Sequence, residues 1–364
     1  MGQLVVGSRE DHPCVSASEH GREVELPALW LRQHSPEETQ RDGMTGQRLF
    51  DPHLLPTDLH LVRADLADGR LSVTFSDGHE SVYESAMLLA NLELSEGLPQ
   101  PISWRADSGQ PNVHRWTDLH DPAAELAAIG DFLTYGAIVF SDVPCVAGTI
   151  LDVAARFGFV RDTNFGPVFD VRSIPNSTDL AYRAVPLSPH TDNPYRTPVP
   201  GIQMLHCLIN ETTGGLSTLV DGLAAVEQLR AEDPDAVELL ATVPVRFRYR
   251  DATTDIVTVR TVVDRDHQGT VTGLNYSPRL DELPLMSDAD TRRYQAARQR
   301  LAHLLASSEF QVRFLLEAGQ LMMFDNNRVL HGRTSFDPNE GLRHLQGCYI
   351  DQDGPRTRYR VLSR

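Results

Sequence analysis

The chain has 364 residues, of which 41% are hydrophobic and 23% are charged, and its formal net charge is −17. This length suits one large core or two unequal ones. No apolar run approaches the ~18 residues that a membrane helix needs. So large a negative charge also disfavours binding to the phosphate backbone of a nucleic acid. We therefore expect no membrane partner and no nucleic-acid partner.

The start of the chain, MGQLVVGSRED, lacks the basic and long apolar regions of a secretory signal, so a cytoplasmic location is expected. The four cysteines are scattered without a C-x-x-C pair and are expected to be reduced and mostly buried. The basic C-terminal segment GPRTRYRVLSR is expected to be a solvated or interfacial tail rather than a nucleic-acid site.

The first hundred residues predict a small β-rich domain. The alternating segments HLVRADL and RLSVTFS flank the turn residues ADG, which is typical of a β-hairpin. The segment LPQPISWRADSGQPN is rich in proline and polar residues, has no periodicity and predicts a linker. We therefore expect one domain over residues 1–105 and a second over 106–364.

The second domain is predicted to be mainly β with flanking helices. Helical spacing occurs in PAAELAAIGDFLTYG, TILDVAARFGF and TRRYQAARQRLAHLLASSEF. Short β runs separated by turn residues occur in AIVFSDV, GIQMLHCLIN, GGLSTLV, VPVRFRYR, TVRTVVD, TVTGLNY, QLMMFDNNRVLHGRTSF and HLQGCYIDQD. Many short strands with few helices favour a barrel or a sandwich of the jelly-roll type.

The stretch SPHTDNPYR places His190 and Asp192 two residues apart. In a strand, both side chains would face the same side of the sheet. His331, from a neighbouring strand, would complete the two-histidine, one-carboxylate set that holds Fe(II) and leaves positions open. Taken alone, such a pair is more often a loop hydrogen bond, with the distant histidine in the core. Arg343 and Ser217 favour the iron site, because an arginine fork and a nearby hydroxyl suit the far carboxylate of 2-oxoglutarate.

Several longer segments carry a family resemblance: ELPALWLR, DLAYRAVPLSPHTDNPYRTPVPGIQMLHC, TGGLSTLVDG, and NNRVLHGRTSF followed by RHLQGCYIDQD. In this order they cover most of residues 20–355. The chain resembles the Fe(II)- and 2-oxoglutarate-dependent dioxygenases of the taurine dioxygenase superfamily, and within it the γ-butyrobetaine hydroxylase branch. The resemblance implies a double-stranded β-helix, a distorted jelly roll, behind a small N-terminal β domain. It also implies Fe(II), 2-oxoglutarate and O2, hydroxylation of an unactivated C–H bond, succinate and CO2 as coproducts, and a homodimer.

Carried over residue by residue, the resemblance makes His190, Asp192 and His331 the iron ligands. It makes Arg343 the partner of the 2-oxoglutarate C5 carboxylate, with Ser217 assisting.

The resemblance also suggests a small zwitterionic substrate with a trimethylammonium head. Four aromatic residues match the positions of an aromatic cage: Phe165, Phe169, Tyr182 and Tyr349. Ring faces stabilise a quaternary cation that cannot donate hydrogen bonds. The alternative is that these are ordinary core rings.

Three positions depart from the γ-butyrobetaine pattern. Asp179 stands where an asparagine usually faces the substrate carboxylate, and Asn193 stands where a tyrosine is usual. Arg279 replaces a neutral amide and could clamp a carboxylate or a phosphonate. Its alternative role is a surface salt bridge with Asp281 or Glu282. These departures favour a substrate other than γ-butyrobetaine itself.

Two other readings of the substrate and the activity remain open. The same oxygenase chemistry could act on a non-quaternary amino acid or on a natural-product intermediate. A non-catalytic quaternary-amine binding protein would instead need a broken ligand triad.

No structural zinc is expected in the N-terminal domain. The family builds a zinc site there from three cysteines after the W-L-R motif and a later histidine. Here WLRQHSPEETQRDG has no cysteine, although His79 occupies the histidine position. One histidine without thiolates binds zinc only weakly.

Overall fold

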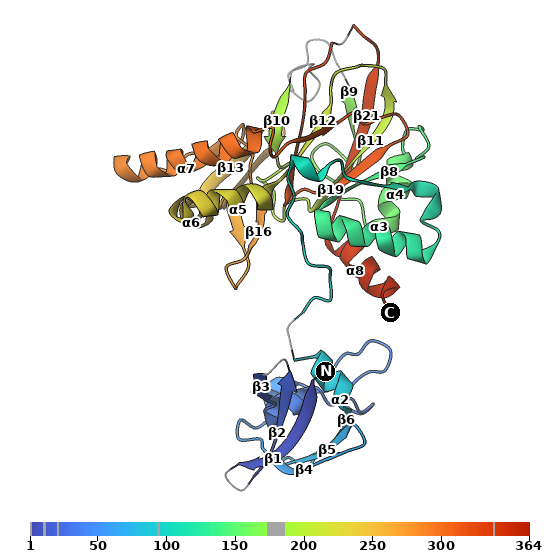
Figure 1. The fold of residues 1–364 in the computed structure, drawn as a ribbon, viewed down its shortest axis with the longest axis vertical. Helices are drawn as coiled ribbons and strands as arrows, with labels where there is room; N and C mark the ends of the chain where they lie inside the picture. Colours follow the sequence, from blue (N-terminus) through green and yellow to red (C-terminus); the bar gives the residue numbers. More distant parts are fainter. Residues whose placement is uncertain (1, 10–11, 20–21, 93–94, 173–185, 338) are drawn as a thin grey trace. The chain divides into compact units, whose positions relative to one another are not determined.

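The computed structural model describes residues 2–9, 12–19, 22–92, 95–172, 186–337 and 339–364 (Figure 1). The chain divides into two compact units, Met1–Glu96 and Gly97–Arg364. This division differs from the predicted boundary at residue 105. From Ile102 onward the expected linker packs with the second unit, because Ile102 N donates to Thr134 O and the Trp104 indole donates to Tyr135 O.

The N-terminal unit is β-rich. Its elements are β1 Gln3–Arg9, β2 His12–Glu19, β3 Arg22–Glu25, α1 Ala28–Gln33, η1 Pro52–Leu54, β4 Leu61–Ala67, β5 Arg70–Phe75, β6 Glu80–Glu84 and α2 Ser85–Ala90. The strands form two three-stranded antiparallel sheets, β1-β2-β3 and β4-β5-β6. The predicted hairpin is confirmed as β4 and β5. Its turn uses Asp68 and Gly69, whose φ angles are 50° and 77°.

A polar cluster of Ser35, Glu37, His79 and Ser81 joins the segment after α1 to the β5–β6 hairpin. Ser35 Oγ lies 2.7 Å from His79 Nε2 and 2.5 Å from Ser81 Oγ. Glu37 accepts hydrogen bonds from Ser35, from Ser81 Oγ at 2.9 Å and from Val82 N at 2.9 Å. Hydroxyls and one carboxylate therefore surround the histidine in the part of the chain that the structure describes.

We expect this unit to hold well under one zinc ion per chain, because hydroxyls and carboxylates bind zinc more weakly than thiolates do. The test is metal analysis of protein purified without added metals, before and after dialysis against a chelator. A His79→Ala variant serves as the matched control. Stoichiometric zinc that resists the chelator in the wild type and is lost in His79→Ala would contradict the expectation.

The second unit contains the remaining elements. Its strands are β7 Asn112–Arg115, β8 Ala137–Ser141, β9 Phe169–Arg172, β10 Leu187–His190, β11 Ile202–Asn210, β12 Ser217–Asp221, β13 Val245–Arg250, β14 Asp255–Arg260, β15 Val263–Arg265, β16 Val271–Leu274, β17 Asp281–Glu282, β18 Val312–Phe314, β19 Leu321–Asp325, β20 Val329–Arg333 and β21 Arg343–Ile350. Its helices are η2 Ala106–Ser108, η3 Trp116–Asp118, α3 Pro122–Tyr135, α4 Thr149–Phe157, α5 Gly222–Glu232, α6 Pro234–Thr242, α7 Asp288–Ala306 and α8 Asp353–Leu362.

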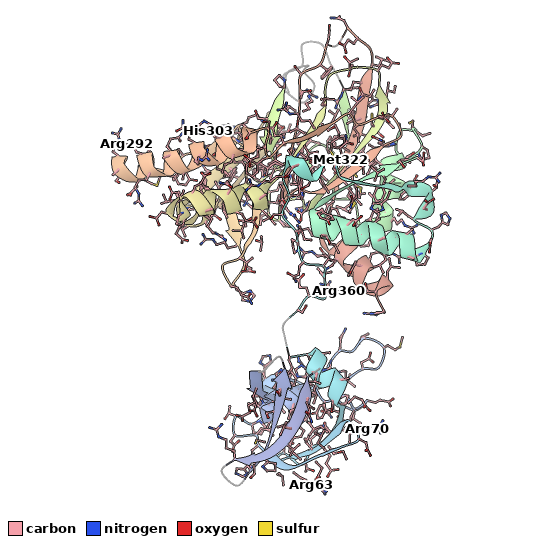
Figure 2. The ribbon with its side chains drawn as sticks, in the orientation of Figure 1. Arg63, Arg70, Arg292, His303, Met322 and Arg360 are labelled. Atoms are coloured by element: carbon pink, nitrogen blue, oxygen red, sulfur yellow. The ribbon has the colours of Figure 1, made fainter. Side chains whose placement is uncertain are left out.

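Two sheets form the centre of this unit. One has six strands in the order β7-β8-β19-β11-β21-β9, and the other has four in the order β10-β20-β12-β18. Alternating residues of β19 show how the core is divided: Met322 and Phe324 pack between the sheets, whereas Leu321 and Met323 pack against α3 and α4. Figure 2 labels Met322 in the interior of this unit. The prediction of a mainly β unit with flanking helices is confirmed.

Helices cover the sheets on two sides (Figure 1). Helix α3 begins where predicted, because Asp121 accepts a hydrogen bond from Ala123 N and Pro122 occupies the first turn; it ends at Gly136, whose φ is 76°. Helices α5, α6 and α7 pack with β13, β15 and β16 in a separate cluster. Among the helices that the structure describes, none is both long and apolar enough to cross a membrane.

One local prediction was wrong, and one held only in part. The segment TVRTVVD is not one strand, because Val262 and Val263 are both buried in the same core cluster, and an alternating strand cannot bury two successive side chains on one side. The C-terminal segment, expected to be a solvated or interfacial tail, forms helix α8, and its Tyr359 and Leu362 pack against the core beside α3 and α4. Arg358 of α8 pairs with Glu125 of α3, a fully buried carboxylate, and this ion pair ties the helix to the unit.

Candidate active site

A cavity of about 530 Å³ opens within the second unit. Nine of the residues predicted from the sequence line it: Phe165, Phe169, His190, Asp192, Ser217, Arg279, His331, Arg343 and Tyr349. Tyr182 and Asp179 lie outside the described residues. The strands and loops that carry the nine residues are far apart in the sequence, and the fold brings them to one place.

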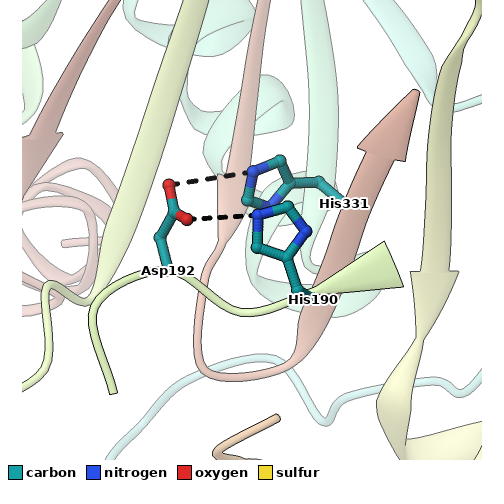
Figure 3. A group of neighbouring side chains, drawn as sticks. All are labelled: His190, Asp192 and His331. Atoms are coloured by element: carbon teal, nitrogen blue, oxygen red, sulfur yellow. Dashed lines mark ion pairs between the residues drawn. The ribbon is translucent and has the colours of Figure 1, made fainter. Parts of the chain in front are cut away.

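The candidate metal ligands meet through the register of two strands. His190, the last residue of β10, lies opposite His331 of β20 in the antiparallel pair. Asp192 Oδ1 lies 3.3 Å from His190 Nε2, and Asp192 Oδ2 lies 3.8 Å from His331 Nε2 (Figure 3). One ligand atom from each residue falls within 4.8 Å of the others; no other group of three such side chains occurs in the part of the chain that the structure describes.

The sequence had suggested that Asp192 lies in the strand, but it does not. It follows β10 by two residues and belongs to a turn in which Asn193 has a φ of 56°. The buried Asn326 holds this turn: its Oδ1 accepts from Asp192 N at 2.7 Å, and its Nδ2 donates to Asp192 O at 2.9 Å. The carboxylate therefore faces the histidines because of a tertiary contact and not because of strand alternation.

The protonation states of the triad suit a divalent metal. Burial lowers the pKa of His331 to about 3, so its imidazole is neutral. His190 Nδ1 donates to Ser188 O at 2.9 Å, which leaves the lone pair of Nε2 free to bind a metal. Burial alone would raise the pKa of Asp192, but the two imidazoles and the hydrogen bonds that it accepts hold it well below its usual value. Two imidazole nitrogens and a carboxylate are a donor set that fits Fe(II).

Arg343 is a buried cation at the start of β21. It is 7% exposed, and its side chain makes no hydrogen bond or ion pair with the described residues; its Nε atom is buried without a partner. Burial lowers the pKa of its guanidinium. The guanidinium stacks on the Phe336 ring at 5.5 Å, beside Arg333 at 5.3 Å. A buried charge of this kind is costly unless an anion pairs with it, so this end of the cavity suits a carboxylate.

Aromatic rings line another part of the cavity. Phe169 and Tyr349 are tilted against each other with centroids 5.3 Å apart, and Phe165 lies edge-on to Tyr249 at 5.7 Å. The Phe169 ring has room because residue 347 is glycine; a Cβ there would lie 2.3 Å from Phe169 Cζ. The predicted rings Phe165, Phe169 and Tyr349 therefore lie at the cavity.

Two rings in the same wall were not predicted from the sequence. Tyr195 and Tyr249 line the cavity and stack on each other at 5.2 Å. Tyr195 stands in the same SPHTDNPYR stretch as the metal ligands. Tyr249 follows the buried Phe247 by two residues in β13, so strand alternation was the signal for it.

Tyr349 also makes a contact that was not predicted from the sequence, where it was expected only as a ring of the aromatic cage. Its hydroxyl donates to Asp192 Oδ2 at 2.7 Å. Burial raises the pKa of Tyr349 well above its usual value, and the Asp192 charge adds to the rise. The phenol therefore stays protonated and acts as a donor.

Arg279 lies at the exposed edge of the cavity. The alternative that it pairs with Asp281 or Glu282 does not hold, because Asp281 pairs with Arg298 and Glu282 pairs with Arg246. The Arg279 side chain makes no ion pair with any described residue. Burial is the main cause of the low pKa of His331, and the positive charge of Arg279 lowers it further.

The chain matches the family model "Taurine catabolism dioxygenase TauD, TfdA family" over residues 96–349 and the model "Gamma-butyrobetaine hydroxylase-like, N-terminal" over residues 17–89. It is 36% identical to gamma-butyrobetaine dioxygenase of Pseudomonas sp. (strain AK-1), over 94% of this chain and 92% of that protein. It is 29% identical to the mitochondrial trimethyllysine dioxygenase of Bos taurus, over 92% of this chain and 82% of that protein.

Among solved structures, the fold is similar to that of PvcB, an Fe, alpha-ketoglutarate dependent oxygenase from an isonitrile synthetic pathway. The TM-score is 0.51 at 20% identity, over 72% of this chain and 95% of that chain. The chain therefore belongs to the TauD/TfdA dioxygenase family, and it is an oxidoreductase that uses Fe(II), 2-oxoglutarate and O2.

Proposed function

We propose that this dioxygenase hydroxylates an unactivated C–H bond of a small zwitterion with a trimethylammonium head, releasing succinate and CO2. The observation that carries the proposal is a single cavity that holds the metal-ligand triad, a buried arginine without a carboxylate partner and a wall of aromatic rings. The homodimer expected from the resemblance stays a prediction.

In this proposal, His190, Asp192 and His331 hold the iron through the two Nε2 atoms and the Asp192 carboxylate. Arg343 binds the C5 carboxylate of 2-oxoglutarate, and Ser217, the first residue of β12, lies at the cavity to assist. Bound iron supplies the oxidation; the residues of this chain position the substrate and exclude water.

The ammonium head is assigned to the rings. Phe165, Phe169 and Tyr349 would present their faces to the cation, together with Tyr195 and Tyr249. The relatives named gamma-butyrobetaine dioxygenase and trimethyllysine dioxygenase carry the names of trimethylammonium compounds, and this similarity supports the assignment.

The opposite end of the substrate is assigned to Arg279, whose guanidinium can bind a carboxylate or a phosphonate with two parallel hydrogen bonds. An arginine at this position favours a strongly anionic group, so we prefer a zwitterion other than γ-butyrobetaine itself. The reactive carbon then lies between the two charged ends.

We expect succinate release to increase when a trimethylammonium zwitterion is added to enzyme, Fe(II) and 2-oxoglutarate. The panel contains betaines, trimethylammonium phosphonates, N-methylated lysines and free amino acids. Each active compound is paired with its neutral isostere, in which a carbon replaces the quaternary nitrogen. Stimulation by the cation and not by the isostere supports the ring site, because only the cation is attracted to the ring faces. Stimulation by uncharged or sulfonated compounds alone would contradict it.

Two arginine variants test the anionic end of the substrate in the same assay, one at the site and one as its matched control. Arg279→Gln should raise the KM of the active substrate by about 10- to 100-fold, since a hydrogen-bonded charge contributes roughly 1.5–3 kcal/mol. Arg292→Gln, on the exposed face of α7 (Figure 2), should leave the KM unchanged. Equal KM values in both variants would show that Arg279 does not bind the substrate.

A further inference from the structure

We propose that Tyr349 is a positioning residue whose hydroxyl orients the Asp192 carboxylate for metal binding, supported in turn by Asn193 and Tyr195. The inference rests on the proposed function, because it takes Asp192 as an iron ligand. It gives Tyr349 a role that is separate from its role as a ring in the substrate site.

The backbone of Asp192 is fixed, but its side chain needs a separate restraint. Asp192 lies in a turn after β10, so the sheet does not set the direction of its carboxylate. Asn326 binds only the main chain of Asp192, through N and O. Apart from the two imidazoles, the described group that contacts the carboxylate oxygens is the Tyr349 hydroxyl, which lies 2.7 Å from Oδ2.

Tyr349 is itself rigidly held. It is 3% exposed, it lies opposite Gln203 in the β11–β21 pair, and its ring packs against Phe169. A donor on a fixed strand restrains a carboxylate better than a mobile surface group, because little conformational entropy is lost when the bond forms. The hydrogen bond therefore keeps Asp192 turned toward His190 and His331 before any metal binds.

Asn193 and Tyr195 add a second hydrogen bond, in the turn that carries Asp192. Tyr195, 2% exposed, donates its hydroxyl to Asn193 Oδ1 at 2.6 Å and so fixes the orientation of the amide. Asn193 Nδ2 is buried and makes no hydrogen bond of ordinary length with the described residues. Asn193 directly follows Asp192 in the turn, and both residues line the cavity together with Tyr195 and Tyr349. The residue that departs from the family pattern thus lies in the turn that carries the metal carboxylate.

The test is the metal affinity of Tyr349→Phe, a change that keeps the ring and removes only the hydroxyl. Mn(II) serves as the probe for the Fe(II) site and is titrated without 2-oxoglutarate, with free Mn(II) followed by electron paramagnetic resonance. We expect the Kd for Mn(II) to rise about 10- to 100-fold, the usual effect of removing a group that orients a metal ligand. Tyr195→Phe should raise it by a smaller factor in the same direction.

Tyr294→Phe is the matched control. Tyr294 is fully buried, and its hydroxyl makes no hydrogen bond with the described residues, but it packs among the α5–α7 helices away from the cavity. This variant loses the same atom and should keep the wild-type Kd. With saturating Fe(II), Tyr349→Phe should also recover most of its kcat, whereas a residue that served only as a cage ring would change the KM of the organic substrate.

Wild-type Mn(II) affinity in Tyr349→Phe, with or without a changed substrate KM, would overturn the proposal. If Tyr349→Phe does not fold, Tyr195→Phe decides, and an unchanged Kd in that variant overturns the proposal as well. Failure of the proposed function gives a different result: the wild type itself would bind no Mn(II) at the triad or release no succinate.

Discussion

Replacing Asp192 with alanine is expected to abolish 2-oxoglutarate turnover while leaving the fold intact. Asp192 supplies the anionic ligand of the triad, and two neutral imidazoles alone hold a divalent ion much more weakly. The fold should survive because the turn is held through the main chain by Asn326 and not through the carboxylate. The measurements are succinate release, the Kd for Mn(II) and the circular dichroism spectrum.

Asp170→Ala is the matched control for Asp192→Ala. Asp170 also carries a carboxylate at the cavity, but it pairs with His344 at 2.7 Å and does not belong to the triad. This variant should bind Mn(II) like the wild type. Wild-type turnover by Asp192→Ala would show that the iron is held elsewhere.

Replacing Arg343 with alanine is expected to raise the KM for 2-oxoglutarate steeply. A carboxylate left in a buried site without its charge partner loses ~3–5 kcal/mol, which corresponds to a factor of roughly 10² to 10³ or more. The effect should fall mainly on KM, because Arg343 lines the cavity but is not one of the metal ligands. The measurement is the initial rate of succinate release over a range of 2-oxoglutarate concentrations.

Two further variants refine this test. One asks whether the charge or the planar shape of the Arg343 guanidinium matters, and the other asks whether Arg333 binds the carboxylate instead. Arg343→Lys keeps the charge but not the planar fork, so it should recover part of the lost affinity. Arg333→Ala removes the second guanidinium that stacks on Phe336. An unchanged KM in Arg343→Ala together with a raised KM in Arg333→Ala would move the 2-oxoglutarate carboxylate to Arg333.

The C-terminal helix shows where local reasoning failed. The segment GPRTRYRVLSR is so polar that its composition suggested a solvated or interfacial tail. In α8, Tyr359 and Leu362 pack against the core, and Arg358 pairs with the buried Glu125, which lies 233 residues earlier in the sequence and also pairs with Arg156. These long-range contacts stabilise the helix, and no local pattern contains them.

The sequence by itself determined the order of the secondary-structure elements, most strands of the second unit and the residue types of the metal triad. Alternating side chains specify strands, and caps and glycines bound helices. His-x-Asp and a distant histidine indicate an iron site only together with Arg343, Ser217 and the family resemblance. Only the tertiary structure decided how these groups meet. The Tyr349 hydroxyl reaches Asp192 across 157 residues, and Arg279 faces the cavity because Asp281 and Glu282 are taken by other arginines. Contacts of this kind depend on the pairing of strands far apart in the chain, which local periodicity does not specify.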